Sequence, residues 1–307
     1  MSADAILVTG AGGFVCSEVV LALARAGRDV IATDRAFDAA TTSRLAGIRR
    51  IEAPFETAMG LLGELRPQAV VHGAALTSGP EALGMSRAAH VCANIGMTAR
   101  ALEAARGAGA ARVLFLSSMG VFAPDDGPVR DGRTTEAALP SAGCPYAAAK
   151  RAGELIVAAA AEVGFEALSL RIGNVFGPHE RARPSRQHLC LAARMRAEAA
   201  AGAITPPAPG APREWAWLPD LADGIAALMA APWAAPLLHA GTPPVCTDGA
   251  LAGMIAARTG ARVAAPPGPA PALRPPMGSA HAGPMAKIAW TPIESALNRL
   301  MPATVLP

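Results

Sequence analysis

The stretch ILVTGAGGFVCSEVV, residues 6–20, has the pattern of a buried strand, a glycine-rich turn and the start of a helix. Glycines in such a turn let the backbone approach a pyrophosphate, whose charge is met by exposed amides and by the positive end of the helix dipole. The stretch therefore predicts a strand–turn–helix unit that binds a dinucleotide. Its expected cofactor-binding residues are Gly10, Gly12, Gly13, Phe14 and Val15.

An acidic residue follows at the distance that a dinucleotide site requires. Asp34 ends the next apolar run, VIATD, 21 residues beyond Gly13. A carboxylate at about this spacing accepts hydrogen bonds from the adenosine ribose and repels a 2′-phosphate, which favours NAD over NADP. Arg35 stands directly after it and favours the opposite choice, because a guanidinium is the usual partner of a phosphate. We expect both residues to contact the cofactor, with NADP as the alternative.

Short apolar runs alternate with longer segments rich in alanine, leucine, arginine and glutamate through the first 178 residues. The runs are hydrophobic continuously rather than at every second position, so we expect burial on both faces, as in a parallel sheet between two layers of helices. This rhythm predicts an α/β fold, a Rossmann-type doubly wound parallel sheet. The predicted strands are residues 5–9, 29–34, 48–53, 69–75, 112–118 and 167–172.

The second part of the chain has a different organisation. Proline- and glycine-rich pieces at 204–212 and 265–278 interrupt short helical segments. We expect an NAD-binding Rossmann domain over residues 1–178. A smaller substrate-binding region over 179–307 would pack at the carboxyl edge of the sheet, where ligands of open α/β sheets bind, and some of its segments could return to the first domain. Alternatively, the proline-rich pieces are surface loops.

Composition excludes several classes of protein. The formal net charge is +3, 17% of residues are charged and no long Lys/Arg run occurs, so we expect no nucleic-acid partner. The five cysteines are scattered without a metal-binding spacing, which indicates reduced thiols and no metal site. No apolar run approaches the roughly 18 residues of a membrane span, and the N-terminus does not have the pattern of a signal peptide. We therefore expect a soluble, cytoplasmic protein.

The stretch GCPYAAAKRAGE, residues 143–154, places Tyr146 and Lys150 one helical turn apart. A phenol with a pKa of about 10 is a poor base at neutral pH. A neighbouring ammonium favours its ionised form and can also donate to the nicotinamide ribose. We expect the pair to take the proton of a substrate hydroxyl while its carbon loses hydride to NAD.

Together these motifs resemble the extended short-chain dehydrogenase/reductase family of NAD-dependent nucleotide-sugar epimerases, dehydratases and dehydrogenases. The resemblance covers nearly the whole chain and rests on several motifs in the family's order. These are TGAGGFVC at 9–16, VVHGAA at 70–75, Asn94, LFLSSMGVFA at 114–123, Tyr146 with Lys150, RIGNVFGP at 171–178 and REWAWLPDLADGI at 213–225.

The resemblance implies roles for individual residues. Ser118, Tyr146 and Lys150 would be catalytic, with Ser117 as support for Ser118 or as its substitute. Ala74 and Ala75 would lie beneath the cofactor, and Asn94 would brace the active-site helices beside it. The implied substrate-binding residues are Ser117, Ser118, Asn174, His179, Arg183 and Arg213. Asp220 is interpreted as a helix N-cap, and His72 as a buried structural residue rather than a catalyst.

This sequence also departs from the family's pattern. Cys16 stands where the third turn glycine is usual, and the Asp that usually contacts adenine after the third strand is missing from IEAPFE, residues 51–56. Phe122 replaces a common Tyr, and Cys144 and Pro145 replace the usual neighbours of the catalytic Tyr. None of these changes removes a reacting group.

Three functions remain open. Met119 and Gly120 stand where family dehydratases have their acid and base, and neither can transfer a proton, so a sugar 4,6-dehydratase is disfavoured. We favour an NAD-dependent epimerase of a sugar or nucleotide-sugar. A dehydrogenase of a small sugar, sugar acid or hydroxy acid is the main alternative, and a noncatalytic dinucleotide sensor is the third.

Two further roles are left as alternatives. The arginines Arg181, Arg183 and Arg186 could bind a substrate phosphate or carboxylate, or form a solvated basic loop. The resemblance also implies a homodimer built on two alanine-rich helical stretches, residues 97–109 and 147–163, which could equally pack on the sheet.

Overall fold

The computed structural model describes residues 5–182 and 189–301, and a seven-stranded sheet forms its centre. The strand order is β13-β8-β5-β4-β1-β2-β3, and every neighbouring pair is parallel. The strands are β1 (Ile6–Thr9), β2 (Val30–Asp34), β3 (Arg49–Glu52), β4 (Ala69–His72), β5 (Arg112–Ser118), β8 (Glu166–Ile172) and β13 (Leu237–His239). The predicted α/β doubly wound fold is confirmed, and six of its strands lie where the apolar runs predicted them.

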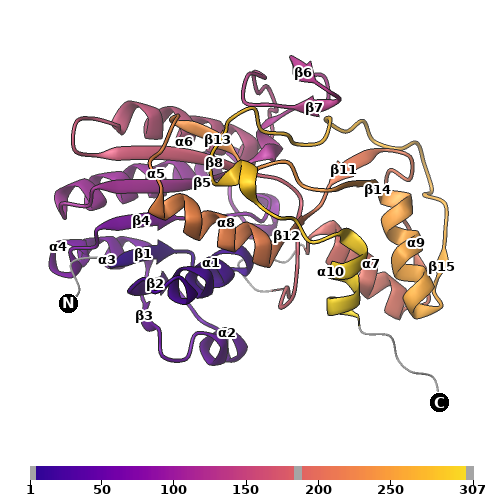
Figure 1. Cartoon of the computed structure of the whole chain (residues 1–307), viewed down its shortest axis with the longest axis horizontal. Helices are drawn as coiled ribbons and strands as arrows, with labels where there is room; N and C mark the ends of the chain where they lie inside the picture. The colour runs from indigo at the N-terminus through magenta and orange to yellow at the C-terminus, as the bar shows by residue number, and fades with distance from the viewer. Residues whose placement is uncertain (1–4, 183–188, 302–307) are drawn as a thin grey trace.

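Helices cover both faces of this sheet, as its two-sided hydrophobicity requires. One face packs against α1 (Phe14–Arg25) and α8 (Leu218–Ala230). The other face packs against α3 (Phe55–Gly60), α4 (Leu62–Leu65), α5 (Arg87–Gly107) and α6 (Pro145–Ala160). The short helix α2 (Ala39–Arg44) follows β2, with Asp38 as its N-cap. Figure 1 shows the two layers on either side of the strands.

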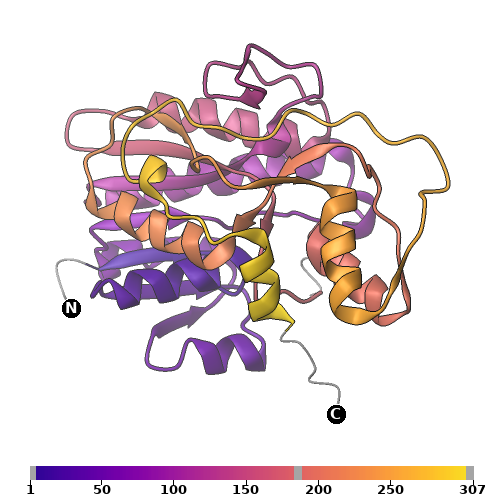
Figure 2. The same cartoon turned by 45° about the vertical axis from the view of Figure 1, so that its right-hand side comes forward.

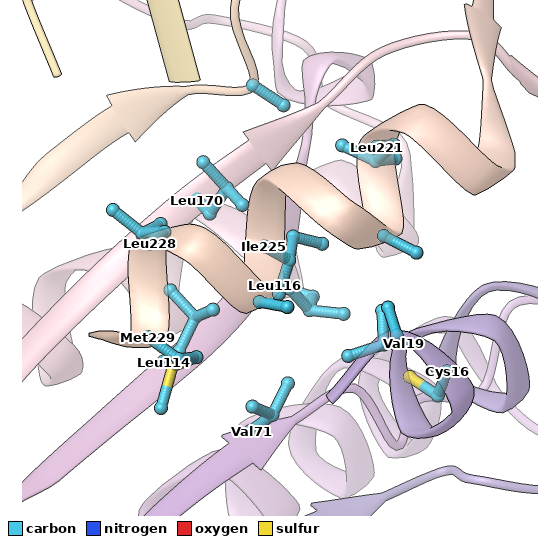
Figure 3. Packing of buried hydrophobic residues seen from close by; sticks show 14 of the residues in the cluster. Cys16, Val19, Val71, Leu114, Leu116, Leu170, Leu221, Ile225, Leu228 and Met229 are labelled. Carbon is cyan, nitrogen blue, oxygen red and sulfur yellow. The ribbon is translucent and has the colours of Figure 1, made fainter. Parts of the chain in front are cut away.

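The chain returns to the sheet after residue 178. β13 pairs with β8 at its edge, and α8 lies on the sheet beside α1. Figure 3 shows Leu221, Ile225 and Leu228 of α8 pointing toward the side chains of β5 and β8, next to Val19 of α1. Each such leucine, when fully buried, contributes about 2 kcal/mol relative to an exposed one. The second half of the chain therefore supplies part of the Rossmann core as well as the smaller region.

The smaller region lies beside the sheet, at the right of Figures 1 and 2. Its helices are α7 (Leu191–Ala200), α9 (Asp248–Thr259) and α10 (Ile293–Leu300), packed around Phe176, Trp215 and Trp217. Short strand pairs connect it: β9 (Val175–Phe176) with β12 (Ala216–Trp217), β10 (Ala203–Ile204) with β15 (Arg262–Val263), and β11 (Pro212–Glu214) with β14 (Val245–Thr247). A hairpin of β6 (Val129–Arg130) and β7 (Arg133–Thr134) lies apart from these pairs.

The interpretation of Asp220 as an N-cap is wrong. Trp217 is the N-cap of α8, and Asp220 lies within its first turn. Its carboxylate accepts hydrogen bonds from the amide and the hydroxyl of Thr291, at 2.5 and 3.1 Å. Asp220 therefore fastens the segment that leads into α10.

Among the described helices, none combines the length and the apolar character needed to cross a bilayer.

Candidate active site

A cavity of about 900 Å³ opens at the carboxyl ends of β1, β2, β4 and β5. Parallel strands bring all their carboxyl ends to one edge, so residues far apart in the sequence meet there. Most of the predicted site residues line this cavity. They are Gly10, Gly12, Gly13, Phe14, Val15, Asp34, Arg35, Ala74, Ala75, Ser117, Ser118, Tyr146, Lys150 and Asn174.

The glycine turn forms a cradle that larger residues would fill. Gly10 has a φ of +71°, and a Cβ there would lie 2.8 Å from the backbone nitrogen of Ala74. A Cβ at Gly12 would lie 2.5 Å from the carbonyl oxygen of Ala36. Gly13 caps α1 with no side-chain hydrogen bond to the helix amides. The turn thus presents backbone donors and the positive end of a helix to the cavity, which suits a pyrophosphate.

Asp34 is held at the edge of this cradle by backbone donors. The amide of Gly12 donates to one carboxylate oxygen at 2.9 Å and the amide of Arg35 to the other at 2.7 Å. Burial raises the pKa of Asp34, and these two amides act in the opposite direction. The carboxylate is therefore oriented toward the place where a ribose next to the pyrophosphate would lie, and the cavity fits a dinucleotide.

Cys16 on α1 occupies space that Gly73, the residue after β4, leaves open. The Sγ atom is buried, and a Cβ added to Gly73 would lie 2.2 Å from it. Burial raises the pKa of this thiol to about 12, so it remains protonated and unreactive. The side chain that replaces the usual turn glycine is therefore accommodated by the glycine that follows β4.

Because Cys16 and Gly73 pack against each other, removing the Cys16 side chain should compensate for a methyl group added at Gly73. Gly73→Ala should destabilise the fold by roughly 1–3 kcal/mol, because the added methyl group overlaps Sγ in a packed interior. Adding Cys16→Gly should recover most of that loss, while Cys16→Ala alone serves as the control for removing the thiol. Denaturant unfolding of the single and double variants measures this coupling. Additive losses would contradict it.

Lys150 lies buried at the floor of the cavity beneath Tyr146. Its Nζ atom donates to the carbonyl oxygen of Leu116 at 2.7 Å, and lies 4.5 Å from the ring centre of Phe115 and 5.7 Å from that of Tyr146. Burial lowers the pKa of Lys150 from 10.5 to about 8. α6 can approach β5 this closely because Gly153 has no side chain, since a Cβ there would lie 2.8 Å from the Phe115 ring.

Ser118 lies where two cavities meet. A smaller cavity of about 250 Å³ shares Ser118, Gly173 and Asn174 with the larger one. The Ser118 hydroxyl accepts a hydrogen bond from the amide of Gly120 at 3.0 Å. The hydroxyl of the buried Ser117 is directed elsewhere and donates to Glu154. Of the two serines, Ser118 is therefore the one placed to contact a substrate, and Ser117 lies in a supporting position.

Two residues of the smaller cavity have no role in the sequence-based predictions. The buried carboxylate of Glu214 accepts from the Arg274 guanidinium, from the backbone and side chain of Asn174, and from the Met277 amide. Arg274 in turn donates to the carbonyl oxygen of Met119 at 3.1 Å. Glu214 directly follows Arg213, which the sequence predicts to bind the substrate. Arg274 lies in the proline-rich stretch 265–278, which has neither a helical nor a strand periodicity that would draw attention to it.

Arg213 lies on the wall of the smaller cavity, as a substrate contact requires. The fully buried carboxylate of Asp248 accepts from its Nε and Nη2 atoms at 2.7 and 3.0 Å. This bidentate pair fixes the plane of the guanidinium. Arg213 is thus oriented by the first residue of α9, a partner that the sequence did not indicate.

The structure does not bring His179 together with the other predicted substrate-binding residues. His179 does not line either cavity, and it lies near Arg44 and Arg181, close to α1 and α2. Partial burial lowers its pKa, and these two cations act in the same direction. The chain at His179 therefore lies away from the smaller cavity. Arg183 and Arg186 lie outside the described residues.

Residues 177–181, here named the crossing segment, join the smaller region to α2. Arg181 at the end of this segment donates to both carboxylate oxygens of Asp38, at 3.0 and 2.9 Å. Asp38 lines the larger cavity on the same wall as Asp34. Cys190 and Leu191 line that cavity where the described chain resumes. The ion pair thus joins the crossing segment to Asp38, a residue that lines the larger cavity.

His72 and Asn94 both serve as buried hydrogen-bonding residues. The His72 ring lies between the hydroxyls of Thr9 and Thr98, at 2.9 and 3.4 Å, and burial lowers its pKa to about 3. Asn94 accepts from the Leu76 amide at 2.8 Å and does not line the cavity. Asn94 thus braces the loop after β4, which does line the cavity, and its predicted contact with the cofactor stays a prediction.

The profile of the NAD dependent epimerase/dehydratase family matches residues 6–237. The chain belongs to this family. It is an NAD-dependent enzyme, and the family's dinucleotide turn and its Tyr146 and Lys150 meet in one cavity. The resemblance to extended short-chain dehydrogenases/reductases is confirmed by this match.

Individual members of this family resemble the chain more distantly. The Putative GDP-L-fucose synthase 2 of Oryza sativa subsp. japonica is 29% identical over 174 residues, 53% of this chain and 49% of the rice protein. The chain thus spans about half the length of this curated relative.

Solved structures share the fold over nearly the whole chain. TunA, an NAD dependent NDP-hexosamine 5,6-dehydratase, superposes with a TM-score of 0.80 at 22% identity, over 97% of this chain and 96% of TunA. A UDP-glucose 4-epimerase from Thermotoga maritima, solved with UDP-glucose, gives 0.77 at 23% identity, over 95% and 96%. At these identities the likeness establishes the fold.

Proposed function

We propose that this enzyme epimerises a sugar or nucleotide-sugar by transient oxidation of a ring hydroxyl to a ketone. The catalytic residues are Ser118, Tyr146 and Lys150. Ser118 holds the hydroxyl, the Tyr146 phenolate takes its proton, and the Lys150 cation favours the ionised phenol. Bound NAD supplies the hydride chemistry, removing hydride from the carbon and returning it to the opposite face.

In this proposal each residue that lines the two cavities has its own role in binding the cofactor or the substrate. The amides of the turn at Gly12 and Gly13 hold the pyrophosphate, and Asp34 accepts from the adenosine ribose. Lys150 donates to the nicotinamide ribose. The substrate lies in the smaller cavity, with Arg213 directed at its phosphate or carboxylate. Asn174 and Ser118, at the junction of the two cavities, position the reacting hydroxyl.

The crossing segment is the observation that favours epimerisation over dehydrogenation. An epimerase regenerates its oxidised cofactor in each cycle and never has to release it, whereas a dehydrogenase must exchange the cofactor at every turnover. We expect the bidentate pair of Arg181 with Asp38, a residue that lines the larger cavity, to slow that exchange. Retention of the cofactor suits a reaction in which the same hydride returns.

The turn after β5 argues against elimination of water. A Cβ at Gly120 would lie 3.2 Å from the Ser118 hydroxyl and 4.0 Å from the Tyr146 ring, so residue 120 faces the catalytic pair. Glycine there offers no acid or base, and the Met119 side chain beside it is buried and cannot transfer a proton. An enzyme with this turn has no proton-transfer group where a dehydratase would use one.

A dehydrogenase of a small sugar, sugar acid or hydroxy acid is the second candidate. The compact volume of the smaller cavity, about 250 Å³, favours it, because a free sugar acid occupies far less space than a nucleotide-sugar. Arg213 would then meet the substrate carboxylate.

One assay separates the two functions. The purified enzyme is incubated with NAD and a panel of UDP-, GDP- and dTDP-sugars and free sugar acids, while NADH absorbance and product stereochemistry are followed. An isomer formed without net NADH is the expected result. Stoichiometric NADH would establish the dehydrogenase and overturn the epimerase proposal.

Opening the crossing segment should accelerate cofactor exchange. Arg181→Gln removes the two charge-assisted donors to Asp38, and we expect NAD to dissociate several-fold faster, roughly tenfold at most, because the pair is partly exposed to solvent. Stopped-flow displacement of bound NADH measures this rate. Arg194→Gln, which breaks an exposed ion pair within α7, is the matched control. Equal rates in both variants would show that the pair does not restrain the cofactor.

A further inference from the structure

Glu154 lies one helical turn beyond Lys150 on α6 and takes no part in the chemistry proposed above. It forms a buried ion pair with Arg171, with side-chain exposures of 7% and 4%. Desolvating two charges costs free energy that well-packed apolar residues of the same size would not cost, so a buried ion pair adds little to the stability of the fold. Its position between the catalytic helix and the sheet suggests a second role.

The contacts of Glu154 connect α6 to the ends of two strands. Ser117 donates to its Oε1 atom at 2.5 Å, and Arg171 donates to Oε1 and Oε2 at 2.8 and 2.7 Å. Ser117 on β5 and Arg171 on β8 are register partners, so both strands are held by one carboxylate. Ser118 is the next residue after Ser117. Any tilt of the carboxyl end of β5 would therefore move the Ser118 hydroxyl.

We propose that Glu154 is a positioning residue of the active site, which fixes the end of β5 through Ser117 and places a carboxylate one helical turn from Lys150. The proposal rests on the catalytic roles assigned above to Ser118 and Lys150. Arg171 donates to both carboxylate oxygens of Glu154, and this bidentate contact fixes the orientation of the carboxylate.

The other groups facing Lys150 do not supply this charge. Cys16 approaches from α1 and His72 from β4, and near neutral pH both are uncharged, since burial raises the pKa of the thiol to about 12 and lowers that of the imidazole to about 3. Tyr146 precedes Lys150 by one turn. The charge of Glu154 raises the pKa of Lys150 and so opposes the effect of burial.

Beyond Arg171 lie further titratable and charged groups, around His239. His239 on β13 lies 3.5 Å from Arg171, and burial lowers its pKa to about 4, so it is neutral near pH 7. Glu136 faces His239 on its other side and accepts from its backbone amide. The Arg274 cation also lies near His239. Burial is the largest influence on the pKa of Lys150, and near neutral pH, where the Cys16 thiol is uncharged, the Glu154 carboxylate opposes it.

The composition of the chain allows a direct test. It contains two lysines, Lys150 and the exposed Lys287. Carbon-13 labelling of the lysine Cε atoms therefore gives two signals, and Lys287→Met assigns them. In Glu154→Gln the titration midpoint of Lys150 should fall by roughly one pH unit, with Lys287 unchanged. Glu162→Gln, which removes an exposed carboxylate just beyond α6, is the matched control and should leave Lys150 unchanged.

Two further variants keep the proposal testable. Because Glu154→Gln leaves the Arg171 charge uncompensated in the interior, the double variant Glu154→Gln/Arg171→Met is titrated beside it. Its midpoint should also lie below that of wild type, but by less than in the single variant, because the Arg171 cation is removed together with the carboxylate. Ser117→Ala leaves the ion pair intact but frees the end of β5. It should leave the Lys150 midpoint unchanged and speed amide hydrogen exchange from Ser118 to Gly120.

The titration and the hydrogen exchange together show whether Glu154 positions the active site or only packs in the interior. A Lys150 midpoint that stays at its wild-type value in the folded variants would overturn the electrostatic role. Unchanged hydrogen exchange in Ser117→Ala would overturn the mechanical one. Neither measurement uses substrate, so both answers stand whichever reaction the enzyme catalyses. Full turnover by Tyr146→Phe would instead remove the proposed function while leaving the lysine titration interpretable.

Discussion

Tyr146→Phe should lower turnover by roughly 10²–10⁴-fold while leaving NAD affinity unchanged. The phenylalanine ring keeps the packing of α6 at the cavity wall, and the variant loses the single group that can take the proton of the substrate hydroxyl. Calorimetric titration with NAD, followed by a steady-state assay on the substrate identified from the panel, separates binding from chemistry.

The chain offers a clean spectroscopic control for this variant. Tyr146 is its single tyrosine, so the near-ultraviolet absorbance of tyrosinate reports this residue without interference from other phenols. The wild-type titration should vanish completely in Tyr146→Phe. Turnover at the original rate by a variant that lacks this signal would exclude the phenol as the catalytic base.

Lys150→Met should make the fold more stable than wild type at pH 7 and lower turnover about a hundredfold. Burial lowers the pKa of Lys150 to about 8, against 10.5 in an unfolded chain, so below pH 8 the folded chain carries a buried cation. Between these two values the folded chain releases the proton and the unfolded chain keeps it. The cost to stability therefore falls as pH rises through this window.

The difference in unfolding free energy between the variant and wild type should thus shrink by on the order of 3 kcal/mol from pH 7 to pH 10.5. Denaturant unfolding at a series of pH values measures it. Lys287→Met is the matched control, because it removes an exposed lysine from the same chain. A difference that stays constant with pH would mean that Lys150 is not a buried cation in the folded state.

The features that the sequence predicts correctly each lie within a single strand, turn or helix. The six predicted strands and the turn after β1 depend on continuous apolar runs and on glycines at fixed offsets. The placement of Lys150 beneath Tyr146 follows from the spacing of one helical turn. These are local properties, so the surrounding fold did not have to be known.

The surroundings of single residues were harder to predict from the sequence. His179 was predicted to bind the substrate, but its neighbours in the structure are Arg44 and Arg181 near α2, outside the smaller cavity. Asp220 precedes a helical run, but the N-cap is three residues earlier at Trp217. A motif specifies which residues adjoin along the chain, and the direction that each takes in space depends on the packing of distant elements.

The sequence by itself determined the doubly wound fold, the glycine turn after β1 and the pairing of Tyr146 with Lys150, because each is encoded by a periodicity or a spacing inside a single strand, turn or helix. Only the tertiary structure decided which charges meet: Arg181 with Asp38, 143 residues apart, and Arg274 with Glu214, 60 residues apart. An ion pair depends on where two side chains arrive after folding, and separations of this length leave no pattern in the sequence.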